Sequence, residues 1–451
     1  MTQLGSNSAA VVVGASMAGL LAAAALAPRL GNVTVVEADE LPDGPVPRKG
    51  VPQARHAHLL LAGGFDGIGR LLPGIGEAIV GAGAVTMDGS REVGFLVRGG
   101  WLEPHARAVP MVSLSRDLLD HVVRTRVASL GNVRFETGTR VEGLRVADGE
   151  ARGVRTSRGD LAGDVVVDAS GRGSRVLEWL AAAGSAPPPE SVVDAGFGYA
   201  TAVLDRLRPL PNGWKLVVVQ PTQDCPRGGV IMQIEGGRGI VSLNGPAGST
   251  PPTDPAGWCA YAASLITPVI ADALPPESEL GAIAGTRSTV NRLRHFWRTT
   301  LPAGLVVVGD AACTLNPIYA QGITVAAATV ERLASLLDRC RSTRELSARF
   351  ARAQLAAVAF PWIVATLEDL RYPATRGRRL PGMAFVQQCL DALFARGTRD
   401  PAAAEALERV LLLMDPPTRL LSPRLVTATL AAALRGEGPA PFEPVPRPRH
   451  G

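Results

Sequence analysis

Three small residues and one acid near the start of the chain have the types and spacing of a dinucleotide-binding turn. Gly14, Ser16 and Gly19 lie between an apolar run and a helix-forming run, and Glu37 follows about 20 residues beyond the turn. Small residues let the backbone approach a pyrophosphate, which free N–H groups and the helix dipole attract. Glu37 can hydrogen-bond a ribose hydroxyl. Ser16 replaces the usual middle glycine, and the alternative is an ordinary strand–helix–strand unit whose glycines serve packing.

The residues around this turn predict a strand at 11–13, a helix at 20–26 and a second strand at 33–36. The uncharged stretch Ala9–Ala27 is almost long enough to span a bilayer, but a membrane helix has no need of glycines at this spacing. A signal peptide would begin with a positively charged segment, but residues 1–8 contain no Lys or Arg. We therefore expect no targeting segment, no membrane span and a cytoplasmic protein.

The composition is typical of a soluble globular enzyme. The chain has 451 residues, of which 46% are hydrophobic and 19% are charged, so that it can bury a large core. The net charge is +5, and the arginines that supply it are dispersed, which argues against a nucleic-acid partner. The five cysteines form no C-x-x-C pair and are expected to be reduced structural thiols. Only His56 and His58 share a spacing that a metal could use, and because no third ligand is in view we expect no metal.

Two later segments again place a glycine turn after a predicted strand. Val165–Val167 leads into DASGRGSR, and GLVVVGDAACTLNPIYAQGITVAA, which begins at Gly304, is typical of a strand, a GD turn, a loop and a helix. Between them, residues 195–205, 214–220 and 229–244 predict further strands. The alternating Met232, Ile234, Val241 and Leu243 suit either the wall of an apolar cavity or any half-buried sheet.

Helices are predicted on both sides of these segments. Ser115 has the type and position of a helix cap before SRDLLDHVVRTRVASL. Residues 341–435 predict helices that are broken at Pro361, Pro373, Pro381 and Pro416–Pro417, and the Pro-rich tail at 436–451 is expected to be disordered.

Together the three glycine-containing segments resemble the single-component FAD-dependent monooxygenases of the aromatic-hydroxylase and squalene-epoxidase superfamily. The resemblance covers roughly residues 8–340. The segment NPIYAQGITVAA and the earlier PRKGVPQARHAHLLLAGG are most similar to bacterial epoxidases of polyketide polyenes. The resemblance implies that Asp310 holds the ribityl chain of FAD, and that the helix opening at Gln321–Thr324 points its N-terminus at the isoalloxazine ring. A helix dipole there stabilises the anionic reduced flavin.

The resemblance also implies where the cofactor-binding residues lie. Arg116 matches an arginine placed near the flavin phosphate or ribityl chain, and its alternative is a solvated residue of the first helical turn. Arg48 is a second candidate, and its alternative is a surface loop. The full set of implied cofactor-binding residues is Gly14, Ser16, Met17, Ala18, Gly19, Glu37, Ala38, Arg48, Arg116, Val141, Gly309, Asp310, Pro317, Gln321, Gly322, Ile323 and Thr324. No catalytic acid or base is predicted.

Three residues depart from the family pattern. Ser170 replaces the aspartate of the usual Asp-Gly pair, which here is Ser170-Gly171. Ala320 stands where many hydroxylases have glycine, and Cys313 where many have histidine. The first departure weakens the role of this segment in linking the cofactor to its reductant. Ser170 and Ala320 leave open a second reading, in which the flavin shapes the pocket of a non-redox cyclase of a polyketide pathway. A non-enzymatic flavoprotein is a further alternative.

The function that the resemblance implies is oxygen transfer. NAD(P)H or a separate reductase would reduce FAD, and a flavin C4a-hydroperoxide would deliver one atom of O₂ to an apolar polyketide- or terpenoid-like substrate by epoxidation or hydroxylation. The expected fold is α/β, with a Rossmann-like FAD-binding domain, an inserted β-sheet substrate domain and a C-terminal helical region. The predicted parts are 1–70, 105–185 and 295–340 for FAD, 71–104 and 186–294 for substrate, and 341–435 for the helices. The sequence leaves the oligomeric state open.

Overall fold

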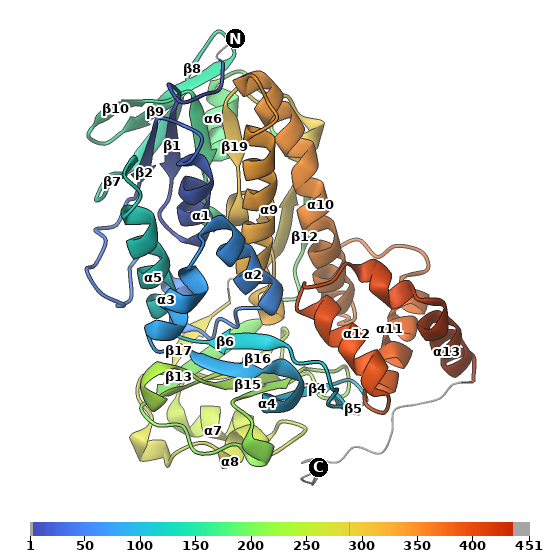
Figure 1. Ribbon diagram of the computed structural model, residues 1–451. Coiled ribbons are helices and arrows are strands. Elements are labelled where there is room, and N and C mark those ends of the chain that lie inside the picture. Colours follow the sequence, from blue (N-terminus) through green and yellow to red (C-terminus); the bar gives the residue numbers. More distant parts are fainter. Residues whose placement is uncertain (1–2, 288, 436–451) are drawn as a thin grey trace.

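A five-stranded parallel sheet forms one layer of the computed structural model, which describes residues 3–287 and 289–435 (Figure 1). Its strand order is β19-β11-β1-β2-β7, and all neighbouring strands run in the same direction. Valine fills most positions, as is usual for parallel strands buried on both faces. The strands are β1 (Ala9–Val13), β2 (Asn32–Val36), β7 (Val133–Glu136), β11 (Val165–Asp168) and β19 (Leu305–Val307). The strands predicted around the first turn are confirmed.

Helices pack against one face of this sheet, and a small antiparallel sheet packs against the other. The helices are α1 (Met17–Leu26), α5 (Arg116–Ala128) and α9 (Gly322–Leu337). Because α1 lies between the sheet and α9, nine of its ten residues are buried, which explains its run of alanine and leucine. Ser115 caps α5 as predicted, since its Oγ accepts a hydrogen bond from the Leu118 N–H. The opposite face carries β8 (Val141–Ala147), β9 (Glu150–Thr156), β10 (Gly159–Ala162) and α6 (Val176–Ala182).

A second, seven-stranded sheet lies beyond the carboxyl edge of the first, with strand order β17-β13-β16-β15-β14-β4-β5 (Figure 1). One of its faces packs on α7 (Pro255–Ala263) and α8 (Val269–Asp272). Its strands are β4 (Val93–Val97), β5 (Gly100–Trp101), β13 (Gly198–Leu204), β14 (Leu216–Val219), β15 (Gly228–Gln233), β16 (Gly239–Gly245) and β17 (Ala284–Thr286).

Shorter elements join the two sheets. A two-stranded ribbon follows α2 and α3, and a three-stranded antiparallel sheet runs from the second sheet toward the third motif. These elements are α2 (Ala62–Leu71), α3 (Ile75–Gly81), α4 (Gly89–Glu92), β3 (Val85–Asp88), β6 (Pro110–Ser113), β12 (Glu190–Val193), β18 (Asn291–Arg294) and β20 (Cys313–Thr314). The predicted α/β fold with two sheets and a helical C-terminal region is confirmed, while the residue bounds of its domains stay a prediction.

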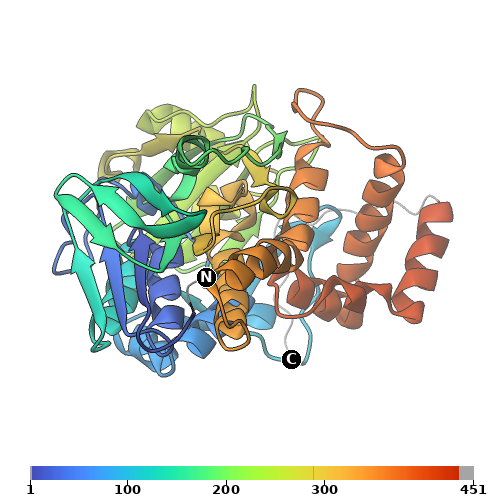
Figure 2. The same cartoon turned by 90° about the horizontal axis from the view of Figure 1, so that it is seen from above.

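The C-terminal helices begin beside the parallel sheet and continue to one side of both sheets, as Figure 2 shows. They are α10 (Thr343–Asp369), α11 (Met383–Gly397), α12 (Pro401–Leu411) and α13 (Pro423–Leu434). The predicted break at Pro361 is wrong, because α10 continues through this residue. Pro361 is buried, and α10 packs on α9 and β18, so tertiary contacts offset the hydrogen bond that the proline removes. The tail at 436–451 lies outside the described residues.

One helix of the described ranges, α10, is long and apolar enough to cross a membrane. Half of its most apolar window is buried inside the protein. Its buried side chains include Phe350 and Val358, which belong to two of the hydrophobic clusters. These contacts are typical of the core helix of a globular protein, and they account for the apolar composition of α10 without a bilayer.

Candidate functional site

The carboxyl edge of the parallel sheet brings the three sequence motifs together. In the register of the sheet, Val13 of β1 is paired with Val36 of β2 and with Asp168 of β11. Asp168 is paired in turn with Val307 of β19. The glycine turn, Glu37 and the other two motifs therefore leave adjacent strands at the same edge. This edge is where open α/β sheets bind their ligands.

The first turn has no room for side chains at two of its glycines. Gly14 has a left-handed φ of +100°, and a Cβ there would lie 2.7 Å from the carbonyl oxygen of Ala169. A Cβ on Gly19 would lie 1.8 Å from the carbonyl oxygen of Gly14. The turn thus packs directly against the segment that follows β11, and α1 begins at the sheet edge as the glycine spacing predicts.

Glu37 and Arg48 hold the turn from two sides. Glu37 Oε2 accepts a hydrogen bond from the Ala15 N–H at 2.8 Å, and Arg48 Nη2 donates to the Ala15 carbonyl at 3.1 Å. Arg48 Nη1 lies 3.3 Å from Glu37 Oε2, and only 9% of Arg48 is exposed. The alternative of a surface loop is therefore wrong for the Arg48 side chain, which is buried at the predicted cofactor site.

Arg116 reaches the same turn from the first turn of α5. Its Nε lies 2.8 Å from Asp120 Oδ1, and its Nη2 donates to Ser16 Oγ at 2.9 Å. Arg116 is 6% exposed, which rules out the solvated alternative. A cation in the first turn of a helix opposes the helix dipole, so an anion at this position would stabilise it. Ser16, the departure from the glycine pattern, is the residue that meets Arg116.

These residues fit the diphosphate of FAD. Arg48 Nη1 is buried and, apart from its ion pair with Glu37 at 3.3 Å, makes no hydrogen bond among the described residues. The first turn of α1 contains no acidic residue, and Ser16 does not cap it through its side chain. The free N–H groups at the start of α1, together with Arg48 and Arg116, therefore make a site in which a diphosphate would find donors and positive charge.

Asp168 is the buried hydrogen-bond acceptor of the second motif. It is fully buried and accepts hydrogen bonds from the Ser170 N–H at 3.0 Å, from Ser170 Oγ at 2.5 Å and from Ser174 Oγ at 2.5 Å. Burial raises the pKa of Asp168, and the serine donors oppose that shift. Ser170 therefore satisfies a buried acid, which gives this departure from the family pattern a structural reason.

Asp310 joins the second motif to the third. Its Oδ2 lies 3.1 Å from Arg172 Nε, and Arg172 Nη2 donates to the carbonyl of Leu315 at 3.0 Å. About a third of the Asp310 side chain is exposed, at 35%. The carboxylate thus remains accessible to a ligand that lies along the sheet edge, as its implied role with the ribityl chain requires.

The loop between Asp310 and α9 is fixed by a buried acid at the end of α10. Asp369 is fully buried and accepts hydrogen bonds from Tyr319 Oη at 2.7 Å, Asn291 Nδ2 at 2.6 Å and Asn316 Nδ2 at 3.2 Å. Burial raises the pKa of Asp369 to about 6, against these donors, which lower it. Three segments distant in sequence therefore meet around one carboxylate.

The start of α9 keeps unused polar groups and open space. Ala320 adopts a left-handed φ of +54° just before the helix. Glycine adopts this conformation most easily, which explains why many hydroxylases have glycine at this position. Gln321 Oε1 and Thr324 Oγ1 are buried without a hydrogen-bond partner in the described part of the chain. A Cβ on Gly322 would meet no atom within 4 Å. This end of α9 therefore leaves space and N–H groups for a ligand.

An apolar cavity of ≈ 170 Å³ lies beside this loop. Its walls come from the second sheet, from residues 317–321 and from the C-terminal helices α11 and α12. Apolar side chains dominate the lining, among them Leu59, Phe95, Leu216, Val230, Phe394 and Leu411. Three charged residues also line the cavity, namely Arg98, Glu368 and Glu408, and Arg98 Nη2 lies 3.6 Å from Glu368 Oε2. Such a cavity suits a neutral, mainly apolar molecule.

The remaining predicted residues lie at the same edge but differ in what they expose. The side chains of Met17, Val141 and Ile323 are buried in hydrophobic clusters, so only their backbones could meet a cofactor. Ala38 is exposed beyond β2. A Cβ on Gly309 would lie 2.6 Å from Ala18 Cβ, which places the third motif directly on α1.

Two features of the site escaped the sequence. Val241 and Leu243 pack on the α7–α8 face, so they do not line the cavity, whereas Ser242 and Asn244 between them do. The alternating sequence predicted a strand here, but the polar residues of an alternating strand are usually interpreted as facing solvent, and Ser242 and Asn244 were therefore missed. No sequence pattern indicated a role for Asp369, because its hydrogen-bond partners are distant in sequence.

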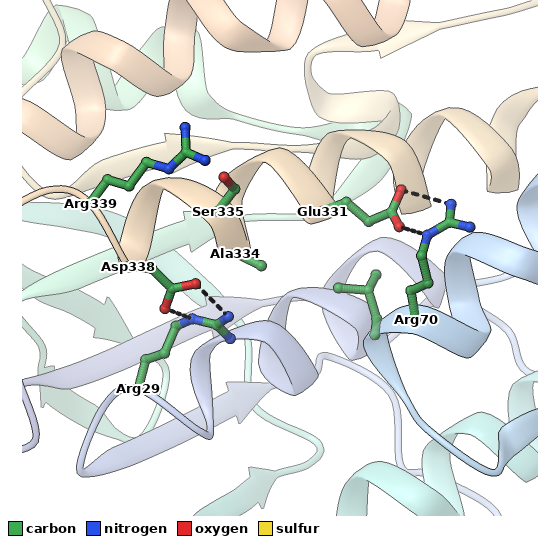
Figure 3. A pocket seen from close by; sticks show the side chains of 8 residues that line it. Arg29, Arg70, Glu331, Ala334, Ser335, Asp338 and Arg339 are labelled. Carbon is green, nitrogen blue, oxygen red and sulfur yellow. Dashed lines mark hydrogen bonds and ion pairs between the residues drawn. The ribbon is translucent and has the colours of Figure 1, made fainter.

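A separate hollow of ≈ 470 Å³ lies at the surface, near the C-terminal end of α9 (Figure 3). Arg29 Nε lies 2.6 Å from Asp338 Oδ1, and Arg70 pairs with Glu331. Its acidic side chains are thus engaged in ion pairs. The lining residues Glu331 and Asp338 place this hollow about 14–24 Å along the helix axis from Gly322. It is not part of the site at the sheet edge.

Comparison with known proteins identifies one curated relative and a common fold. The chain is 30% identical over 458 residues to Protein Rv3254 of Mycobacterium tuberculosis, and the match covers 94% of each chain. No family model matches.

Solved structures with this fold include flavin enzymes. A probable FAD-dependent monooxygenase of Pseudomonas aeruginosa, PqsL, has a TM-score of 0.56 at 18% identity, over 81% of this chain and 97% of that one. Klebsiella pneumoniae HpxO, solved as a variant complexed with FAD, has a TM-score of 0.59 at 17% identity, over 94% and 99%. The Diels-Alderase PyrE3 of pyrroindomycin biosynthesis has a TM-score of 0.57 at 19% identity, over 91% and 81%. At these identities the likeness shows the fold.

Proposed function

The chain belongs to the family of Protein Rv3254, and we propose that it is a cytoplasmic FAD-dependent monooxygenase. Its substrate would be an apolar secondary metabolite of the polyketide or terpenoid type, which it epoxidises or hydroxylates with one atom of O₂. One observation carries the proposal: residues 317–321 form both the approach to α9 at the predicted flavin site and a wall of the apolar cavity. A substrate in this cavity would therefore lie against the predicted position of the flavin ring.

Residues from each motif would hold the cofactor. Arg48, Arg116 and the start of α1 would bind its diphosphate, Glu37 its adenosine ribose and Asp310 its ribityl chain. The N-terminus of α9 would face the ring, where its dipole stabilises negative charge. Bound FAD would supply the activation of O₂, with electrons from NAD(P)H or a separate reductase.

The chain itself would orient the substrate and exclude water. The apolar walls of the cavity and the C-terminal helices that close one side keep the reaction space poorly hydrated. Electrophilic oxygen transfer requires no acid or base from the protein, and we assign none. Cys313, one of the few side chains that could carry a covalent flavin, is buried in a hydrophobic cluster, and burial raises the pKa of its thiol. We therefore propose non-covalent FAD.

A non-redox cyclase is the second candidate. It is supported by the fold shared with PyrE3 and by the two departures at Ser170 and Ala320. In that case the flavin would shape the cavity, and conversion of the substrate would need neither O₂ nor a reductant. The two functions therefore differ in their requirement for oxygen.

The test is conversion of apolar polyketide and terpenoid candidates by the flavin-loaded protein under ¹⁸O₂ and under anaerobic conditions. A monooxygenase places one ¹⁸O atom in the product and makes no product without oxygen. Anaerobic conversion to an isomer of the substrate would support the cyclase and refute oxygen transfer. Asp310→Ala should lower flavin occupancy and raise hydrogen peroxide relative to product, because a loosened ring admits water.

A further inference from the structure

The wall of the cavity that β13 and β16 form is polar, although the rest of the lining is mainly apolar. Ser242 and Asn244 lie on the cavity side of β16, and Asn244 is paired in the register with Tyr199 of β13. All three line the cavity, and Ser242 and Asn244 are at most 5% exposed. Polar groups this deeply buried are normally hydrogen-bonded within the protein or to a ligand.

Most of this wall has its partners inside the protein. Ser242 Oγ accepts from the Ala57 N–H at 3.1 Å and shares a hydrogen bond with Thr201 Oγ1 at 2.5 Å. Tyr199 Oη donates to Asn316 Oδ1 at 3.0 Å. Burial raises the pKa of Tyr199, so its phenol stays protonated and keeps donating. These groups are therefore engaged before any substrate arrives.

Asn244 is the exception. Its Oδ1 is buried and has no hydrogen-bond partner among residues 3–287 and 289–435. Other cavity-lining residues with a buried unpartnered side-chain atom are Gln321 and Glu368, and in both cases the atom is again an oxygen acceptor. Gln321 lies at the proposed flavin site. The wall of the cavity therefore contains oxygen acceptors that have no donor, and a ligand that donates hydrogen bonds would satisfy those that turn toward it.

The charges around the cavity are paired with one another. Glu368 Oε2 lies 2.9 Å from Arg371 Nε and 3.6 Å from Arg98 Nη2. Asp391 completes the cluster, with Arg371 Nη2 at 3.0 Å from its Oδ1. On the other side, Glu408 Oε2 lies 2.5 Å from His105 Nε2. Among the described residues at the cavity, Arg98 and Arg371 both have acidic partners, so an anionic substrate would find their charge already neutralised and would face unpartnered acceptor oxygens.

We propose that Asn244 determines specificity by binding a hydroxyl group of a neutral, mainly apolar substrate. The inference rests on the proposed function only in taking this cavity as the substrate site. A hydroxyl can donate to the Asn244 oxygen and can also accept from its NH₂ group if the amide turns. A carboxylate in its place would bind more weakly, since it cannot donate to the Asn244 oxygen and is repelled by Glu368.

Binding of three matched probes tests this proposal. Isothermal titration of the full chain as purified compares 2-naphthol, naphthalene and 2-naphthoate, which share one ring system. We expect 2-naphthol to bind about tenfold more tightly than naphthalene, and 2-naphthoate to bind more weakly than both. Asn244→Leu should abolish the preference for 2-naphthol, because leucine keeps the branched shape of the side chain and removes the acceptor. Asn32→Leu, the same change at an exposed position of β2 outside the cavity, should keep that preference.

Several results would overturn the proposal. These are a preference for 2-naphthol that survives in Asn244→Leu, no preference in the unaltered protein, or no binding of any probe. Asn244→Ala, which is smaller than asparagine, replaces the leucine variant if that variant does not fold, as judged by its thermal unfolding. FAD content is measured on the same samples. Loss of the preference with FAD retained separates this inference from the flavin proposal, which fails only if FAD itself is absent.

Discussion

At the scale of single residues, the predicted cofactor site is a set of buried charges that meet at one glycine turn. Arg48 and Arg116 are buried beside Glu37 and Asp120, and each guanidinium also contacts the turn itself. Removing one partner from such a cluster leaves its neighbour unpaired and buried. This lowers the free energy of unfolding more than the loss of an exposed ion pair does. Substitutions here should therefore change cofactor binding in ways that similar exposed residues do not.

Glu37→Ala should weaken FAD binding, whereas Glu40→Ala should not. Glu37 holds the Ala15 N–H and Arg48 and is proposed to bind the adenosine ribose. Glu40, three residues on, is 75% exposed and contacts Thr137. Loss of a charge-assisted hydrogen bond corresponds to about 1.5–3 kcal/mol, or a Kd for FAD about ten- to a hundredfold higher. Equal dissociation constants for the two variants, measured by titration of the apoprotein, would refute the assignment of Glu37.

At the scale of elements, the loop before α9 depends on α10 for its position. Asp369 ends α10 and receives hydrogen bonds from β18 and from two residues of the loop. The same surroundings keep Ala320 in its strained, left-handed backbone conformation. The C-terminal region therefore supports the proposed ring site as well as one wall of the cavity.

Asp369→Ala should destabilise the protein by about 3 kcal/mol or more, because it leaves three buried donors without an acceptor. Asp338→Ala is the matched control. Asp338 is 56% exposed and pairs with Arg29 at the surface hollow of Figure 3, so its loss should cost less than about 1 kcal/mol. Urea unfolding measures both. Similar midpoints for the two variants would show that the Asp369 network does not fix the loop.

The sequence predicted those elements whose signals are local. The strands before Gly14 and Asp310, the cap at Ser115 and the glycine-opened helix at Gly322 follow from spacing within a dozen residues. The Asp369 network joins segments that are 50 to 78 residues apart, so no local pattern could reveal it. Pro361 was misread for a related reason, since the packing that keeps α10 continuous is tertiary.

At the scale of the whole molecule, burial of ionisable groups sets how stability varies with pH. Burial, and next the charge of Arg116, lowers the pKa of His58 to about 3. Between that pH and the ordinary value near 6.5, the unfolded chain is protonated at His58 while the folded chain is not. The contribution of His58 is therefore complete above pH 6.5 and is lost as the pH falls. Asp369, with its pKa raised to about 6, has the opposite slope below that pH.

His58→Gln should therefore lose less stability in acid than the unaltered protein does. Between pH 7 and pH 4 we expect the unaltered chain to lose at least about 1 kcal/mol more of its free energy of unfolding than the variant. Because Asp369 is present in both chains, its opposing slope cancels in the comparison. Urea unfolding at several pH values measures the difference. Parallel pH profiles for the two proteins would contradict a His58 that is half-buried and neutral in the folded protein.

The amount and attachment of flavin in the purified protein test the central claim most directly. The glycine turn, the buried arginines and the start of α9 together predict one FAD per chain, released into solution when the protein is precipitated with acid. Gly14→Val should abolish this binding, because a side chain at Gly14 would meet the Ala169 carbonyl oxygen at 2.7 Å. A folded protein that is colourless and takes up no added FAD, or flavin that stays on the polypeptide after acid precipitation, would contradict the account.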